Sequence, residues 1–151
     1  TDINSHRLDF AKKVGADFVI PANEDVPSQI LKINNNRLAD RVIASTGALP
    51  ALTTALRSVD RAGTVLFFAP TGPGIDLPIP FNDLWRNCIH LIPTYGAAPL
   101  DIAVAIDLIG SGRISVREMI THRLGLAETG NGFQLVTEAR ESIKVIIEPH
   151  R

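Results

Sequence analysis

Cysteine is almost absent from the sequence, and aromatic residues make up only 5% of its 151 residues. The single cysteine, Cys88, excludes a disulfide within the chain and is compatible with a reducing, cytoplasmic location. No apolar run approaches the ~20 residues that a membrane-spanning helix needs, so no membrane partner is expected. The net charge is -1 and no cluster of Lys and Arg stands out, which argues against a nucleic-acid partner.

The composition that remains is ordinary for a globular protein, and helix and strand signals alternate along it. Asn4 or Ser5 can cap a first helix that Gly15 ends. Further helices are expected over residues 25–33, 49–59, 82–86, 99–110, 114–119 and 127–138. Extended segments are expected over residues 16–20, 41–44, 64–68, 89–93, 120–124 and 143–147, and a surface loop over residues 70–80. This alternation predicts an α/β fold, a doubly wound parallel sheet with helices on both faces.

The first helix has almost no strand in front of it. A parallel crossover needs a strand before its helix, and only residues 1–3 are available for one. We therefore expect an incomplete sheet that lacks its first strand and the Gly-rich phosphate loop. The sequence, which has no initiator Met, is expected to be part of a longer protein.

Ligands of such sheets bind at the carboxyl ends of the strands. At those ends lie Asp2, Ser45 with Thr46, residues 67–69 and residues 93–95. An acid in the position of Asp2 accepts hydrogen bonds from ribose hydroxyls and repels a 2′-phosphate, which favours NAD over NADP as the cofactor. The alternative is a solvated acid. For Ser45 and Thr46 the alternative is capping of the next helix.

The four histidines and Cys88 do not form a metal-binding pattern. A catalytic zinc needs three protein ligands, and the pair Cys88 and His90 has no third ligand nearby in the sequence. No arrangement of Ser, His and Asp or of Cys and His indicates a nucleophile. We therefore assign no metal ligand and no catalytic residue to this chain.

Several segments, taken in order, carry a resemblance to a known family. They are Asp2-Ile3-Asn4 with Arg7, Gly15-Ala16-Asp17, Leu84-Trp85-Arg86-Asn87, Thr94-Tyr95-Gly96, residues 119–124, Gly132-Phe133 and residues 142–146. In this order they resemble the C-terminal part of the zinc-dependent medium-chain alcohol dehydrogenases, most closely the sorbitol and threonine dehydrogenase branch. The resemblance implies the later part of a Rossmann-like coenzyme domain over residues 1–95. It implies that residues 96–151 return to the catalytic domain.

The resemblance also implies roles for individual residues. Arg7 would reach the adenosine ribose, Ser45 and Thr46 would lie on the adenine side, and Lys144 would reach the pyrophosphate. Four residues would wall the nicotinamide pocket: Phe67, Ala69, Pro93 and Tyr95. The alternatives are a surface arginine, a solvated lysine, and core packing for at least one of Phe67 and Phe68.

The expected function is that of a fragment of an NAD-linked alcohol or polyol dehydrogenase, whose substrate is a small-molecule alcohol. Zinc would be bound outside this chain, and the chain alone would be inactive. The resemblance further implies a homo-oligomer that pairs through the coenzyme domain, with residues 85–93 at the interface. Two alternatives stay open, a zinc-independent reductase of the same superfamily and a non-catalytic nucleotide-binding or assembly module.

Overall fold

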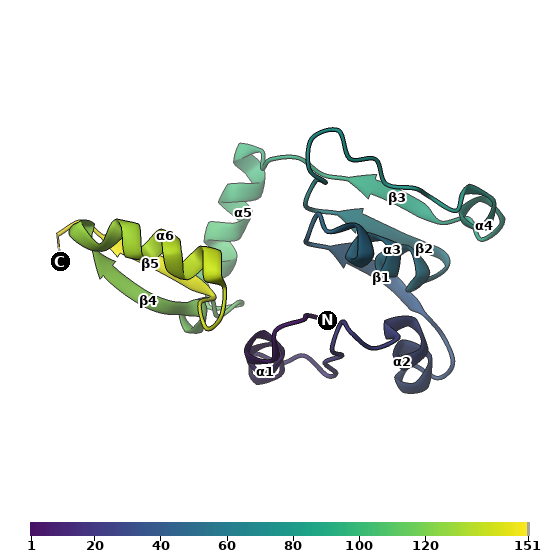
Figure 1. Ribbon diagram of the computed structural model, residues 1–151, viewed down its shortest axis with the longest axis horizontal. Helices are drawn as coiled ribbons and strands as arrows, with labels where there is room; N and C mark the ends of the chain where they lie inside the picture. The colour runs from purple at the N-terminus through teal and green to yellow at the C-terminus, as the bar shows by residue number, and fades with distance from the viewer. Residues whose placement is uncertain (151) are drawn as a thin grey trace. The chain divides into compact units, whose positions relative to one another are not determined.

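The structure is a computed structural model that describes residues 1–150 (Figure 1). The chain divides into two compact units. The first contains Thr1 and residues 20–96 and is called the three-strand unit, after its sheet. The second contains residues 2–19 and residues 97 onward and is called the two-strand unit.

The three-strand unit is built on a parallel sheet with the strand order β1-β2-β3. Its strands are β1 (Ala39–Ala44), β2 (Val59–Phe67) and β3 (His90–Pro93). Figure 1 shows them side by side, and the register joins Ala44 to Phe67 and Phe67 to Pro93. The last residues of the three strands therefore stand level with one another.

Helices cover one face of this sheet. Helix α3 (Leu49–Arg57) packs directly on β1 and β2, α4 (Phe81–Arg86) contributes Leu84 to the same core, and α2 (Val26–Ile33) contacts α3. Burial of apolar surface against the sheet stabilises this layer. The core contains Leu52 of α3, which is 2% exposed, and Val65 of β2, which is fully buried. Other buried members of the core are Ala44, Ala55, Leu56, Val59 and Leu84.

The other face of the sheet carries the alternate residues of each strand. Ile43, Leu66 and Ile92 are partners in the register and so form one row across this face. Ile43 is 66% exposed and Ile92 is also exposed. Within the three-strand unit, the helical layer thus lies on the face of Val42 and Val65.

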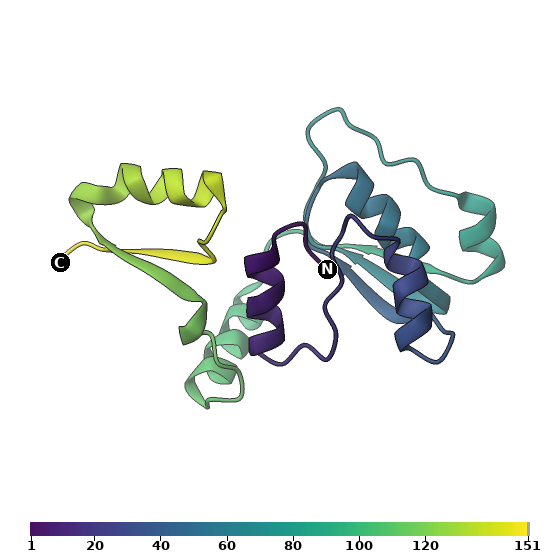
Figure 2. The ribbon, with the colours of Figure 1, turned by 60° about the horizontal axis from the view of Figure 1, so that its bottom comes forward.

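The two-strand unit has a parallel pair of strands covered by a helix. The strands β4 (Ile120–Gly125) and β5 (Lys144–Glu148) are joined through η2 (Leu126–Glu128) and α6 (Thr129–Glu138). Figure 2 shows α6 lying along the pair. A Cβ at Gly132 of α6 would stand 3.2 to 3.5 Å from the side chains of Ile147, Leu124 and Val145, so the helix approaches the strands closely at this residue.

The remaining helices of this unit are α1 (Ser5–Lys13), α5 (Pro99–Gly110) and the short η1 (Arg117–Met119). Pro99 begins α5, where its missing N–H costs nothing, and the Asp101 carboxylate accepts the N–H of Ala98 at 2.8 Å. None of the residues of α5 is buried, although Leu100 and Ile106 are among its large apolar side chains. Among residues 1–150, no helix has the length and apolarity to cross a membrane.

The structure confirms the α/β class and nearly all the expected elements, with shifted ends. The prediction of a strand over residues 16–20 is wrong, because these residues form no strand. Ile20 is buried, as an apolar strand residue would be, but Phe18 is 59% exposed. A strand is held by hydrogen bonds to a neighbouring strand, and neither sheet of the described residues includes this segment.

Two boundaries differ for local reasons. Helix α3 ends at Arg57, because Ser58 donates its N–H to the carbonyl of Ala55 at 3.1 Å and its own carbonyl accepts the N–H of Ala39 in β1 at 3.0 Å, so that β2 begins at Val59. β2 therefore starts well before residue 64. The helix expected over residues 114–119 is reduced to the three residues of η1.

Candidate functional site

The carboxyl edge of the three-strand sheet brings together most of the predicted coenzyme residues. Two backbone hydrogen bonds fix this edge, from the N–H of Phe68 to the carbonyl of Ala44 at 2.9 Å and from the N–H of Thr94 to the carbonyl of Phe67 at 3.1 Å. Two of the predicted residues end strands, Phe67 in β2 and Pro93 in β3. The others lie in the segments that leave the sheet, namely Ser45, Thr46, Ala69 and Tyr95.

The two hydroxyl residues lie between β1 and α3. Ser45 and Thr46 are exposed, and α3 has no side-chain cap, so neither hydroxyl caps this helix at its first residue. The Thr46 hydroxyl instead accepts the N–H of Ala48 at 3.4 Å. Both residues are exposed at the edge of the sheet, so the Ser45 hydroxyl and the Thr46 hydroxyl proton are available for hydrogen bonds.

Phe67 and Phe68 are neighbours with different environments. Phe67 packs against the buried core of the three-strand unit, whereas Phe68 is 65% exposed. The expectation that at least one of the two is a core residue is therefore confirmed for Phe67.

The next segments present small or fully exposed groups. Ala69 is half-buried two residues beyond β2, Pro93 ends β3 and is exposed, and the side chain of Tyr95 is fully exposed. Tyr95 precedes Gly96, whose φ of 66° lies in the left-handed region that favours glycine. This turn sets the direction in which the chain leaves the edge.

A contact between two backbone segments completes this edge, and it was not predicted from the sequence. Gly47 approaches the loop after β2 so closely that a Cβ placed on it would lie 1.9 Å from the carbonyl oxygen of Pro70. The turn after β1 and the loop after β2 therefore touch at Gly47. The only signal in the sequence was a glycine after two hydroxyl residues, which any turn would also explain.

Asp2 and Arg7 lie together in the two-strand unit. Asp2 Oδ2 is 3.9 Å from Arg7 Nη1, and Asp2 Oδ1 accepts the N–H of Asn4 at 2.9 Å. Both side chains are partly exposed, so the ion pair is weak. A carboxylate has about four acceptor positions, and these two contacts leave capacity for hydroxyl donors.

Lys144 also lies in the two-strand unit, where it begins β5 and is exposed. Its carbonyl accepts the hydroxyl of Thr121 at 3.2 Å, and the same hydroxyl accepts the N–H of Ile143 at 3.1 Å. These bonds fix the backbone at the start of β5. They do not involve the ammonium group of Lys144, which lies at the end of a flexible side chain.

Residues 1–150 contain no group of three or more His, Cys, Asp or Glu side chains that could hold a metal ion. Cys88 is exposed and has a φ of 53°, so it belongs to the turn before β3 and not to the strand. The donor set of residues 1–150 does not fit a zinc site.

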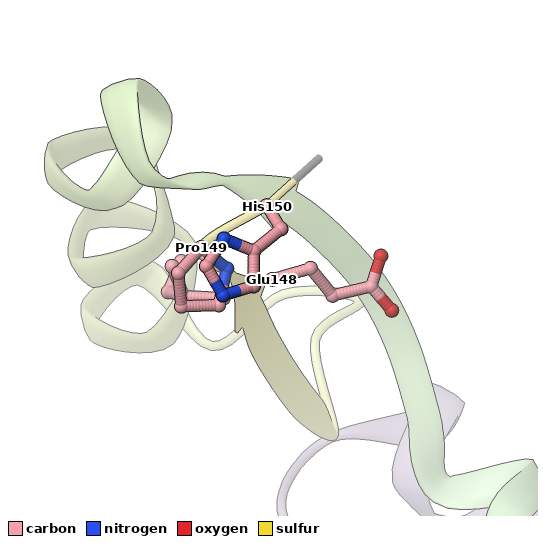
Figure 3. A pocket seen from close by; sticks show the side chains of 4 residues that line it. Glu148, Pro149 and His150 are labelled. Atoms are coloured by element: carbon pink, nitrogen blue, oxygen red, sulfur yellow. The ribbon is translucent and has the colours of Figure 1, made fainter.

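A shallow depression of about 410 Å³ lies at the end of β5 and is shown in Figure 3. Its lining consists of the consecutive residues Ile147, Glu148, Pro149 and His150. The Glu148 carboxylate is already paired with Arg123. No second element contributes a side chain, and no predicted site residue lies there.

Comparison with known proteins identifies the family. Residues 1–111 match the family model described as zinc-binding dehydrogenase. The chain is 32% identical over 149 residues to D-arabitol-phosphate dehydrogenase of Enterococcus avium, covering 96% of this chain and 41% of that protein. It is 28% identical over 151 residues to L-threonine 3-dehydrogenase of Sinorhizobium medicae, covering 98% and 42%.

Solved structures show the same fold. A putative zinc-binding dehydrogenase from Sinorhizobium meliloti, solved with NADP bound, superposes with a TM-score of 0.85 at 21% identity, covering 97% of this chain and 43% of that one. The chain thus spans about two fifths of the length of the relatives it matches. The family match over residues 1–111 shows that the chain belongs to the zinc-binding dehydrogenase family.

Proposed function

We propose that this chain supplies coenzyme-binding residues to a zinc-dependent, NAD-linked alcohol or polyol dehydrogenase. One observation carries the proposal, the level carboxyl edge of β1, β2 and β3 in a chain of the zinc-binding dehydrogenase family. The carboxyl edge of a parallel sheet is where α/β folds of this type bind their ligands.

In this proposal the edge of the three-strand unit holds the two ends of the coenzyme. Ser45 and Thr46 offer exposed hydroxyls to the adenine side. Ala69, with Phe67, Pro93 and Tyr95, forms the nicotinamide side. The small side chain of Ala69 leaves backbone groups accessible, which suits a carboxamide that needs both a donor and an acceptor.

Asp2 would hold the adenosine ribose, and it carries the preference for NAD. Its carboxylate already accepts the Asn4 N–H and retains capacity for the two ribose hydroxyls. A 2′-phosphate at the same place would meet the negative charge of Asp2 and would be disfavoured. Arg7 beside it limits that repulsion, and removal of Asp2 would leave Arg7 available to a phosphate.

Lys144 would attract the pyrophosphate as a mobile point charge. Its exposure at the start of β5 is consistent with a side chain that closes on a ligand. We also propose that residues 1–95 belong to the coenzyme domain and residues 96–151 to a segment that returns to a catalytic domain.

Zinc does not enter this part of the proposal, because the donor set of residues 1–150 does not fit it. When bound, the nicotinamide coenzyme supplies the acceptor for a hydride from the carbinol carbon of a small alcohol. The residues described here bind and orient that coenzyme. The groups that activate the alcohol would belong to the complete enzyme.

We further propose a cytoplasmic homo-oligomer that pairs through the edge strand β3. β3 is paired on one side only within the described residues, and Trp85 and Ile92 near it are exposed. An unpaired edge strand offers backbone donors and acceptors to a second copy. Light scattering of wild-type protein and of an Ile92→Lys variant tests this; equal masses at matched concentrations would contradict it.

The function is tested with the purified chain in two measurements. The first offers it NAD with sorbitol, threonine and simple alcohols, and no turnover is expected. Turnover of any of them would contradict the assignment of the catalytic groups to the rest of the enzyme. The second records amide chemical shifts during a titration with NADH.

In the titration, weak binding with shifts at Ser45, Thr46 and Ala69 is expected, because the three-strand unit is proposed to contact only the two ends of the coenzyme. Shifts confined to other residues, or none at millimolar NADH, would contradict the proposed site. Micromolar binding would instead favour a self-contained nucleotide-binding module.

A further inference from the structure

Gly47 and Pro70 are in contact, and each belongs to a segment with its own role in the proposed function. Gly47 lies between Thr46 and α3, and Pro70 follows Ala69 in the loop after β2. Because Ala44 and Phe67 are partners in the parallel register, the two segments leave the sheet from adjacent positions. Their contact therefore spans the adenine side and the nicotinamide side of the proposed site.

The contact leaves no room for a side chain. A Cβ on Gly47 would lie 1.9 Å from the carbonyl oxygen of Pro70, 2.9 Å from its carbonyl carbon and 3.3 Å from the Cα of Thr71. All three atoms belong to the backbone, so no rotamer change can relieve the overlap. The φ of Gly47 is not in the left-handed region, so the requirement for glycine here is one of space and not of conformation.

The loop on the other side of the contact cannot yield at Pro70 alone. The Thr71 hydroxyl donates to the carbonyl of Ile75 at 2.7 Å, and the N–H of Ile75 donates to the carbonyl of Gly72 at 3.0 Å. Leu77, further along, packs against the buried core. A displacement of Pro70 would therefore be passed to Ala69 on one side and to the turn over residues 71–75 on the other.

We infer that Gly47 is a positioning residue, which sets the separation between the Ser45–Thr46 segment and Ala69 by letting the two backbones touch. This inference rests on the proposed function, because it assigns that separation to the coenzyme site. Any larger residue at position 47 must move the loop away from the β1 turn and so widen the edge at which the coenzyme binds.

The test compares the full chain with its Gly47→Ala variant and with Gly72→Ala as the matched control. Gly72 lies in the same loop, has no left-handed φ, and a Cβ there would meet only Ile75 Cγ1 at an ordinary 3.7 Å. Amide spectra are recorded first without ligand and then with NADH. All measurements are made at a temperature where circular dichroism shows each protein folded.

Without ligand, the amide signal of Ala69 should move in Gly47→Ala, together with that of Thr71, whereas Gly72→Ala should disturb Thr71 as its own neighbour and leave Ala69 in place. With NADH, the shifts at Thr46 and Ala69 should persist in the wild type and the control and be lost in Gly47→Ala. Unchanged Ala69 and Thr71 signals, or a normal NADH response, would overturn the inference. A purely structural role would lower the unfolding temperature but spare the NADH response of the folded variant.

A second variant covers the case in which Gly47→Ala does not fold. Adding Pro70→Gly frees the loop to move aside, so the double variant should fold and still lose the NADH response; a folded double variant with the wild-type response would overturn the inference. If the wild type itself shows no NADH response, the proposed function fails. The ligand-free spectra then still decide whether Gly47 sets the position of Ala69.

Discussion

The backbone N–H of Phe68 donates a hydrogen bond of 2.9 Å to the carbonyl oxygen of Ala44, just beyond the last residue of β2. The bond from Thr94 to Phe67 repeats this arrangement between β2 and β3. Because of these bonds the strands end at one level, and the segments after them start from a common edge. The predicted coenzyme residues that follow β1, β2 and β3 in the sequence therefore lie in the same order across the edge of the sheet.

The core of the three-strand unit should depend strongly on Leu52. This residue of α3 is 2% exposed, so Leu52→Ala removes buried apolar atoms and leaves a cavity. We expect the free energy of unfolding to fall by about 2–5 kcal/mol. Urea unfolding measures this loss.

The control variant Ile43→Ala removes the same number of carbons from a side chain that is 66% exposed and should cost less than about 1 kcal/mol. Similar losses for both variants would mean that the opposite face of the sheet is buried in solution.

Gly63 should tolerate no side chain. A Cβ there would lie 2.6 Å from Val59 Cγ2 and 2.7 Å and 2.9 Å from the carbonyl oxygens of Asp60 and Asp40. Forcing such a contact in a packed sheet costs typically about 1–3 kcal/mol. Gly63→Ala should therefore unfold at a lower temperature than the wild type. Gly110→Ala, at the end of α5 with nothing within 4 Å of the new Cβ, should be neutral or slightly stabilising.

The helices were predictable from the sequence because their signals are local. Pro99 at the start of α5, Gly15 after α1 and the apolar spacing within α3 act through residues a few positions away. The level edge of the sheet also followed from general topology, since parallel strands with short helical crossovers present their carboxyl ends on one side.

The misses arise from contacts between distant residues. Residues 16–20 have the composition of a strand, but strand formation requires a partner, and composition does not say whether one is present. β2 begins at Val59 because Val59 pairs with Ala39 across the sheet, ahead of Ala62, which has a φ of 55° and donates its N–H to Asn87. Nothing in the sequence around Ala62 or Asn87 predicts that hydrogen bond.

The site was predicted in the same uneven way. Ser45, Thr46 and Ala69 were chosen as candidates because they follow expected strands, and the structure places them after β1 and β2. The contact of Gly47 with Pro70 could not be predicted, because it depends on the path of a loop of irregular structure. The division of Phe67 and Phe68 between core and solvent was open at the level of sequence. It was decided by the register, which places Phe67 on the same face as Val65.

Asn4 should stabilise the two-strand unit in two ways. Its side-chain oxygen accepts the N–H of Arg7 at 3.3 Å, which caps α1, and its amide donates to the carbonyls of Ala139 at 2.9 Å and Arg140 at 2.8 Å. Asn4→Ala should lower the free energy of unfolding by about 1–3 kcal/mol, because it loses the cap and leaves two carbonyls without this donor.

The Asn4→Asp variant separates the two contributions. It keeps an acceptor for Arg7 but sets a carboxylate oxygen against the two carbonyl oxygens, so it should be no more stable than Asn4→Ala. Denaturant unfolding of both variants, beside Asn131→Ala on the exposed surface of α6, measures the difference. The control should stay within about 0.5 kcal/mol of the wild type. Wild-type stability for Asn4→Asp would show that only the cap matters.

Removal of the Asp2 carboxylate should shift coenzyme preference towards NADP in the complete dehydrogenase proposed above. In Asp2→Ser, the 2′-phosphate no longer meets a negative charge, and Arg7, now 3.9 Å from Asp2, is released to bind it. We expect the ratio of kcat/KM for NAD to that for NADP to fall by about tenfold or more, which corresponds to about 1.4 kcal/mol. Asp9→Ser, which removes an exposed acid from α1, the helix of Arg7, should leave the ratio unchanged. The double variant Asp2→Ser with Arg7→Ala should lose the gain in NADP use, because no cation then remains there to bind the 2′-phosphate. An unchanged ratio in Asp2→Ser would remove Asp2 from the coenzyme site.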